Sequence, residues 1–242
     1  MSKRFKGRLC VYCCGEAGLT PDHIFARQFF LENARANLPQ VPSCARCNSD
    51  KSKLEHYLTT VLPFGGRHAD ALGNLSSMVP KRLQKNQKLR RELAQHRSGP
   101  TIPLDSERLE DLFGLVARGL IWHHWNAYLD PARHSVRTAI LTPAGMDLFD
   151  GLLFQRNGQD RVKENLGNGT FLYEGVQAVD DPATSIWRFL IYGGLAVSEE
   201  GDESGPVLCQ IVAMTGPDTA MQMWDGIKQR SGERARQQSD QI

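Results

Sequence analysis

The sequence predicts an α+β protein in which two cysteine pairs hold a small N-terminal unit together, with helices in the middle and an antiparallel sheet near the end. Three observations support this prediction. Two Cys-x-x-Cys pairs lie within the first fifty residues, apolar residues recur at helical spacing after residue 105, and β-branched and aromatic runs follow residue 170. With 242 residues, of which 40% are hydrophobic and 23% charged, the chain is long enough to bury a core.

The composition divides the chain into four parts. Both cysteine pairs lie in residues 1–65, which end in a Pro- and Gly-containing break, LPFGGRHADALGN. A basic helical connector is expected over 66–99, and an α+β domain whose role no motif indicates is expected over 100–227. The polar residues 228–242 are expected to form a disordered tail.

Two helices are expected in the first half of the 100–227 region. In LDSERLEDLFGLVARGLIWHHWNAYL the apolar residues recur at helical spacing, and Asp105 or Ser106 is the expected N-cap. His123 and His124 lie on this helix between two tryptophans, so we expect them to pack rather than to catalyse. A second helix should begin at TPAGMDLFDGLLF, where a threonine can cap the helix and the next proline fits the first helical position.

Three later segments predict the strands of the antiparallel sheet. TFLYEGVQAV, SIWRFLIYGGLAV and VLCQIVAM are rich in β-branched and aromatic residues, and the turn sequences DDPAT and EEGDESGP separate them. Cys209 lies in the third segment and is expected to be a small core residue.

The cysteines are expected to bind metal rather than to form disulfides. The N-terminus, MSKRFKGRLCVYCC, is basic but has no apolar run behind it, and no later segment is long and apolar enough to span a bilayer. These features predict a cytoplasmic protein without a membrane partner. In that reducing compartment, two Cys-x-x-Cys pairs favour metal binding.

Cys10, Cys13, Cys44 and Cys47 match the ligand set of a structural zinc site. Zn²⁺ takes four tetrahedral ligands, and each Cys-x-x-Cys turn lets two sulfurs reach one ion. Cys14 could replace Cys13, but the spacing of Cys10 and Cys13 is the commoner one. A site with four thiolates has no open position, so the reaction centre is expected elsewhere.

Asp22, His23 and Asn48 are the residues that such a zinc site would bring together. Asp22 and Asn48 offer the hard oxygen ligands that Mg²⁺ or Mn²⁺ prefers. His23 titrates near neutrality and could accept a proton from an attacking water. The simpler interpretations are a turn residue after Pro21, a structural histidine and a helix-capping asparagine. His56 is a further candidate metal ligand.

Three motifs, CVYC, PDHIFAR and CARCNSDK, resemble those of the HNH, or ββα-metal, endonucleases of the type with two Cys-x-x-Cys pairs. The resemblance covers about the first sixty residues. It implies a small zinc-stapled ββα-metal nuclease domain in which His23 is the general base, while Asp22 and Asn48 bind the divalent ion. It also implies that Asn37 orients the base across a hairpin and that Arg27 contacts phosphate.

Basic residues near these motifs predict a nucleic-acid partner, with DNA expected and RNA as an alternative. Arg46, Lys51 and Lys53 surround the second cysteine pair, and another basic run extends over 81–97. A solvated face is the simpler interpretation of any single run. Two functions follow: a metal-dependent HNH endonuclease that hydrolyses phosphodiester bonds in DNA, or a non-catalytic zinc-stapled module that binds nucleic acid.

Overall fold

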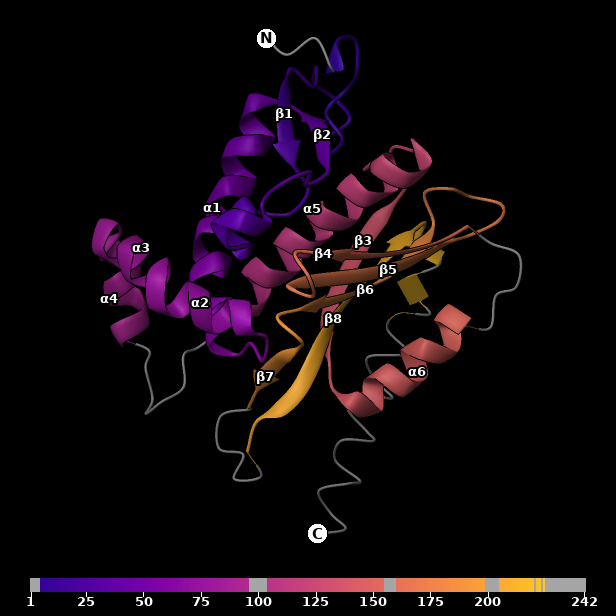
Figure 1. Cartoon of the computed structure of the whole chain (residues 1–242). Helices are drawn as coiled ribbons and strands as arrows, with labels where there is room; N and C mark the ends of the chain where they lie inside the picture. Colours follow the sequence, from indigo (N-terminus) through magenta and orange to yellow (C-terminus); the bar gives the residue numbers. More distant parts are fainter. Residues whose placement is uncertain are drawn as a thin grey trace.

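The computed structural model describes residues 5–95, 104–154, 160–198 and 205–219, together with residues 221, 222 and 224. Over these residues the chain is a mixed α+β protein, as the sequence predicts, with helices and an antiparallel sheet (Figure 1). The predicted tail, 228–242, lies outside the described residues.

The N-terminal unit is a short antiparallel hairpin followed by a helix. Its elements are β1 (Thr20–His23), β2 (Gln40–Ser43) and α1 (Ala45–Val61), with two 3-10 turns between the strands at Arg27–Phe29 and Glu32–Ala34. Asp22 pairs with Val41, and His23 pairs with Gln40. Because side chains alternate along a strand, Asp22 and His23 point to opposite faces of the hairpin.

A group of short helices follows α1. They are a 3-10 turn (Leu62–Phe64), α2 (Ala69–Ser77), α3 (Val79–Lys85) and α4 (Gln87–Gln95). The segment expected to be a break therefore contains a helix, α2. The basic stretch expected to form one helix is divided at Asn86, whose backbone leaves the helical conformation. The Oδ1 atom of Asn86 accepts a hydrogen bond from the N–H of Leu89 at 3.0 Å and so caps α4.

The two helices predicted in the next region are present as α5 (Ser106–Trp125) and α6 (Pro143–Phe154). Asp105 is the N-cap of α5, because its Oδ1 atom accepts a hydrogen bond from the N–H of Arg108 at 3.0 Å. At the start of α6, the carbonyl of Thr142 accepts a hydrogen bond from the N–H of Met146 at 2.9 Å.

The antiparallel sheet contains all three predicted strand segments, as β5 (Phe171–Gln177), β6 (Ser185–Ile191) with β7 (Leu195–Val197), and β8 (Val207–Gly216). The sequence did not predict β3 (Ser135–Leu141) or β4 (Arg161–Leu166). Neighbouring strands follow the order β3-β8-β6-β5-β4, with β7 beside β8. Cys209 is buried in β8, as expected.

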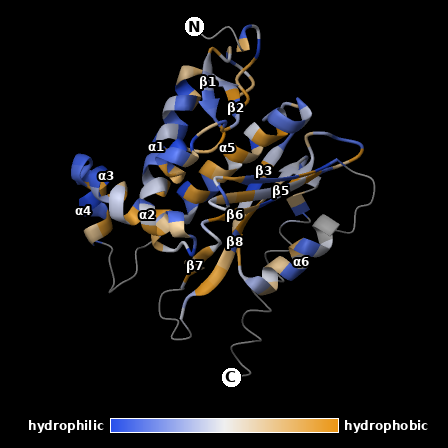
Figure 2. Ribbon diagram, viewed as in Figure 1, coloured by the Kyte–Doolittle hydropathy of each residue, from blue (hydrophilic) through white to orange (hydrophobic). Residues whose placement is uncertain are grey.

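One apolar core spans the predicted boundary at residue 65, because α5 lies between the N-terminal unit and the sheet (Figure 1). The ring of Phe25, just after β1, lies 4.4 Å from the ring of Phe171 in β5. The ring of Phe113 in α5 lies 6.1 Å from the same Phe171 ring. α6 contributes to a second, smaller cluster on the other face of the sheet. In Figure 2, β8 is largely hydrophobic, whereas α1 and α3 are mainly hydrophilic.

A glycine lets α5 approach the end of β1. A Cβ atom on Gly119 would lie 3.1 Å from the side chain of Ile24, which directly follows His23. Glycine costs about 1 kcal/mol relative to alanine inside a helix, so its presence is explained by this close approach. The contact fixes the end of β1 against α5.

Candidate metal centre and catalytic site

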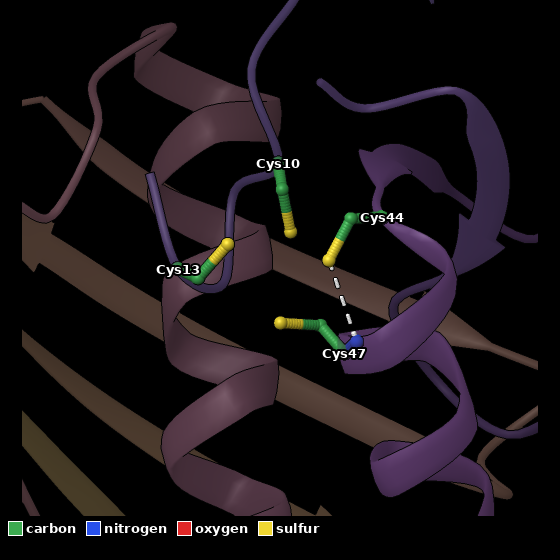
Figure 3. A group of neighbouring side chains, drawn as sticks. All are labelled: Cys10, Cys13, Cys44 and Cys47. Carbon is green, nitrogen blue, oxygen red and sulfur yellow. Dashed lines mark hydrogen bonds between the residues drawn. The ribbon is translucent and has the colours of Figure 1, made fainter. Parts of the chain in front are cut away.

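Four thiols meet at the start of α1 (Figure 3). Cys10 and Cys13 lie in the loop before β1, whereas Cys44 and Cys47 belong to the first turn of α1. These four residues are the cysteine cluster, and their sulfur atoms all lie within 4.8 Å of one another. Tetrahedral Zn–S bonds of about 2.3 Å place the sulfurs about 3.8 Å apart. The cysteine cluster therefore has the composition and size to hold one metal ion.

Backbone hydrogen bonds hold both halves of the cysteine cluster. The N–H of Cys14 donates to the carbonyl of Cys10 at 2.9 Å and closes the first turn. The N–H of Val11 donates to the carbonyl of Pro42 at 3.1 Å and ties that turn to β2. Cys44 is the N-cap of α1, and its sulfur accepts a hydrogen bond from the N–H of Cys47 at 3.4 Å, drawn as a dashed line in Figure 3.

The thiols of the cysteine cluster differ in how readily they ionise. Burial raises the pKa of Cys44 and of Cys47. Burial also opposes the ionisation of Cys13, but hydrogen bonds from the backbone N–H groups of Gly15 and Glu16 outweigh it and lower the Cys13 pKa to about 7. The backbone thus stabilises the thiolate of Cys13, whereas a nearby cation would favour ionisation of Cys44 and Cys47.

Cys14 lies outside the cysteine cluster. Its backbone has a φ of 56°, and its sulfur donates a weak hydrogen bond to the carbonyl of Leu129 at 3.4 Å. The sequence favours Cys13 over Cys14 as a ligand, and it is the Cys13 sulfur that lies in the cysteine cluster.

Asp22 belongs to a buried group of charged and polar side chains, here called the ionic network: Tyr12, Asp22, Lys51 and Glu55. Lys51 is 0% exposed, and its Nζ atom lies 3.2 Å from Oδ2 of Asp22 and contacts Oε1 of Glu55. The hydroxyl of Tyr12 donates to the same Oδ2 atom at 2.6 Å. The Nζ atom of Lys51 also donates to the carbonyl of His23 at 2.7 Å. The ionic network therefore joins α1 to β1 and to the cysteine-bearing loop.

Burial shifts two pKa values in the ionic network. It raises the pKa of Glu55, and the positive charge of Lys51 opposes that change. It also raises the pKa of Tyr12, and the Asp22 carboxylate adds to that change. The positive charge of Lys51 thus offsets the negative charges of two carboxylates in a region shielded from solvent.

His23 faces the other side of the hairpin, where Gln40 contacts it. The side-chain nitrogen of Gln40 donates a hydrogen bond to Nε2 of His23 at 3.1 Å. Nδ1 of His23 has no hydrogen-bond partner among the described residues. Burial lowers the pKa of His23, and the charges of Arg27 and Lys51 lower it further against the opposing charge of Asp22. The imidazole is therefore neutral at pH 7, with one ring nitrogen able to accept a proton.

Asn48 lies one helical turn before Lys51, so both residues share a face of α1. The N-cap of α1 is Cys44, and the side chain of Asn48 forms no hydrogen bond within the described part of the chain. Asn48 therefore does not cap the helix. Asn37 lies in the loop before β2, where it is exposed and has a φ of 59°. The structure thus brings Gln40, rather than Asn37, against the ring of His23.

The cations expected to contact nucleic acid are mostly paired with carboxylates. Arg46, with a side chain 68% exposed, lies 3.3 Å from Glu16, and the 74% exposed Lys53 lies 2.7 Å from Asp50. Lys51 was expected to contact nucleic acid, but it is fully buried in the ionic network and does not reach the surface. A paired exposed cation has part of its charge offset before any polyanion arrives.

The two histidines on α5 lie beside aromatic rings. The ring of His124 lies 6.2 Å from the ring of Trp187, and its Nε2 atom lies 3.0 Å from the hydroxyl of Tyr173. Burial, with the charge of His123, lowers the pKa of His124 to about 4. His124 is therefore neutral at pH 7 and fits the packing role that the sequence predicts.

Three side chains of the site were not predicted from the sequence: Tyr12, Gln40 and Glu55. Tyr12 lies between the first two cysteines, so a metal-bound turn would fix its position. Glu55 follows Lys51 by four residues, and such pairs meet on a helix. The sequence therefore contained a signal for these two residues. Gln40 becomes visible only once the hairpin register is known.

Neither protein-family models nor curated proteins nor solved structures match this chain. Within the described residues, every helix is too short or too polar to cross a lipid bilayer. The function is therefore inferred from the residues of the site.

Proposed function

We propose that this chain is a metal-dependent endonuclease of the HNH type that hydrolyses phosphodiester bonds in DNA. One observation supports this most directly. Asp22 and His23 are neighbours at the end of β1, yet a buried cation and a hydroxyl bind the carboxylate while the imidazole is neutral with a free ring nitrogen. A carboxylate oxygen next to a neutral imidazole supplies a hard metal ligand and a proton acceptor side by side, which suits metal-assisted hydrolysis.

The cysteine cluster is proposed to hold a structural zinc ion. Four thiolates suit a soft or borderline metal, and a ligand set of four sulfurs leaves no coordination position for a substrate. The ion would tie the loop that carries Tyr12 to the first turn of α1. In that role it would position the ionic network rather than take part in the reaction.

Asp22 and Asn48 are proposed to hold a divalent Mg²⁺ or Mn²⁺ ion. Tyr12 and Lys51 both contact Oδ2 of Asp22, and Oδ1 has no hydrogen-bond partner among the described residues. The side-chain oxygen of Asn48 is likewise without a partner there, and both are hard donors of the kind these ions bind. When bound, such an ion stabilises negative charge on the scissile phosphate and on the leaving oxygen.

His23 is proposed to act as the general base. Its Nδ1 atom would accept a proton from a water molecule while the water oxygen forms a bond to phosphorus and the bond from phosphorus to the leaving sugar oxygen breaks. This role requires the side chain of Gln40 to present its oxygen to Nε2, because the amide nitrogen donates to Nε2 and leaves the ring proton on Nδ1. The charge of Arg27 would help to keep the imidazole neutral before the reaction.

A second candidate is a zinc-stapled module that binds nucleic acid without cutting it. The supporting observation is that Lys51 already balances the carboxylate of Asp22, which is only 8% exposed. A carboxylate satisfied in this way can have a purely structural role. The two candidates differ in whether the chain cuts DNA.

The deciding experiment compares wild-type protein with His23→Ala on plasmid DNA, with and without added Mg²⁺ or Mn²⁺. We expect cleavage by the wild-type protein only with the divalent ion, and a loss of about 10²- to 10⁴-fold in His23→Ala. His134→Ala is the matched control, because His134 lies just before β3 and outside the N-terminal unit. RNA of the same sequence, tested in parallel, shows whether the protein cuts DNA, RNA or both.

DNA affinity and zinc content of His23→Ala should equal those of the wild-type protein, since His23 belongs to neither the cysteine cluster nor a cation surface. Cleavage by His23→Ala at the wild-type rate, in a preparation free of contaminating nuclease, would show that His23 is not the base. Wild-type protein that binds DNA without cutting it would support the binding module instead.

A further inference from the structure

Two arginines are anchored on the short segment that follows β1. The Nη2 atom of Arg82, from α3, donates to the carbonyl of Gln28 at 3.0 Å, and its Nη1 atom donates to the carbonyl of Thr59. The Nε atom of Arg35 donates to the carbonyl of Phe30 at 3.1 Å. Backbone carbonyls two residues apart thus hold the two guanidinium groups near each other.

Neither guanidinium group has a carboxylate partner within the described residues, although both carry a full charge. Arg35 also has a buried nitrogen, Nη2, without any hydrogen-bond acceptor there. An unpaired buried donor costs free energy, and for a charged group the cost is larger than for a neutral one. An anion beside the exposed part of these side chains would offset their positive charge.

The pKa of Arg82 agrees with a short distance between the guanidinium groups of Arg35 and Arg82. Burial lowers the pKa of Arg82, and the charge of Arg35 lowers it further. Arg27 begins the turn that carries the Gln28 carbonyl bound by Arg82, and its side chain is exposed. Arg27, Arg35 and Arg82, here called the arginine cluster, therefore all lie on or against the segment that follows β1.

The neighbouring helix adds to this positive surface. α3 contains Lys81 and Lys85 beside Arg82, and its sequence VPKRLQK has no acidic residue. Figure 2 shows α3 as strongly hydrophilic. By contrast, the exposed cations near the cysteine cluster, Arg46 and Lys53, are paired with carboxylates.

We infer that the arginine cluster binds backbone phosphates of the nucleic-acid strand next to the phosphate held at His23. This inference rests on the proposed function. Guanidinium groups bind phosphate through paired N–H donors, and their fixed planar geometry suits a site that positions a strand. The strand would run from the end of β1 along the Arg27–Phe29 turn toward α3.

The test measures how DNA affinity depends on salt concentration for Arg35→Gln/Arg82→Gln, using a fluorescent duplex oligonucleotide and the full chain. Removing one cation that neutralises a phosphate should reduce the slope of log affinity against log salt by about 0.9. We therefore expect a reduction of about 1.8 for the double variant. Arg46→Gln/Lys53→Gln removes the same charge from paired cations and should change the slope less.

Arg82 also contacts the backbone of α1, so its replacement can disturb the fold. Arg27→Gln/Arg35→Gln is the second variant, because Arg27 is exposed and Arg35 is only half-buried. Thermal unfolding verifies that each variant is folded before binding is measured. A folded variant with reduced affinity and a reduced slope supports the phosphate contacts, whereas reduced affinity with an unchanged slope would argue against them.

Two further outcomes separate this inference from the proposed function. An unchanged slope in both variants, while the wild-type protein binds and cuts DNA, would show that the arginine cluster does not bind phosphates. The proposed endonuclease activity would be unaffected by that result. Wild-type protein that neither binds nor cuts would overturn both. Inorganic phosphate provides the last comparison: if it stabilises the wild-type protein and not the variants, while duplex binding is unchanged, the site takes free phosphate and the inference is wrong.

Discussion

The cysteine cluster and the ionic network lie on neighbouring turns of α1, yet they balance their charges in different ways. The cysteine cluster consists of four thiols brought together from two segments. The ionic network brings two carboxylates together and contains its own cation, Lys51. The cysteine cluster would gain its positive charge from a bound metal ion, whereas the ionic network contains a positive charge of its own in Lys51.

Tyr12 connects these two clusters. It lies between Cys10 and Cys13, and its hydroxyl donates to Asp22 at 2.6 Å. Binding a metal at the cysteine cluster would therefore restrain a side chain that positions the proposed catalytic carboxylate. The cysteine cluster thus acts on the proposed site in part through the ionic network, and three variants separate the two contributions.

Replacing a cysteine of the cluster should have the largest effect. Structural zinc contributes about 10–16 kcal/mol in small zinc domains, which is comparable with the whole stability of a typical domain, about 5–15 kcal/mol. Cys44→Ser should therefore lose its metal and its N-terminal fold, as measured by metal analysis and circular dichroism. Because the N-terminal unit shares its core with the sheet, the remaining structure should unfold at a lower temperature as well.

Cys14→Ser is the matched control for Cys44→Ser, because Cys14 is adjacent in sequence to the cluster but not part of it. It should keep a full complement of metal and unfold near the wild-type temperature. Metal retained in Cys44→Ser, or absent from the wild-type protein, would contradict the proposed structural site.

Removing the buried cation should have the next largest effect. Lys51→Met leaves Asp22 and Glu55 without their counter-charge, and breaking a buried ion pair typically costs about 3–5 kcal/mol. The pKa of Glu55 is already raised by burial, and Lys51 is what opposes that rise. The variant should therefore be least stable above the carboxylate pKa and should recover stability as the pH falls through it.

Denaturant unfolding of Lys51→Met at several pH values measures both expectations. Lys53→Met, which changes an exposed lysine on the same helix, should alter the free energy of unfolding by less than about 1 kcal/mol. Equal losses in the two variants would mean that burial of Lys51 carries no special cost.

Removing one hydroxyl should have the smallest effect. Tyr12→Phe keeps the ring and deletes the hydrogen bond to Asp22, and a hydrogen bond to a charged group is worth about 1.5–3 kcal/mol. The variant should be destabilised by about that amount, cut DNA more slowly and keep its full metal content. Tyr128→Phe, whose hydroxyl makes a long 3.5 Å contact with Leu9, is the control. A loss of metal in Tyr12→Phe would show that Tyr12 supports the cysteine cluster itself.

Local sequence patterns predicted the features that depend on residues close together in the sequence. Asp105 caps α5 through its own neighbouring backbone, and the four cysteines are recognisable from spacing alone. β4, RVKENL, was missed because it is a polar edge strand whose side chains carry no alternating pattern. The contact of Gln40 with His23 was missed because it depends on the register between two strands. The burial of Lys51 was missed because it depends on contacts with β1.

The shared core also determines the order in which the chain can finish folding during synthesis. The hydroxyl of Tyr192 donates to the carbonyl of Phe29 at 2.7 Å, across 163 residues of sequence. At about 5 to 20 residues per second on the ribosome, those 163 residues take roughly 8 to 33 s to add. During that interval the aromatic side chains of the segment that follows β1 have no sheet to pack against. The N-terminal unit emerges first from the ribosome but reaches its final packing among the last.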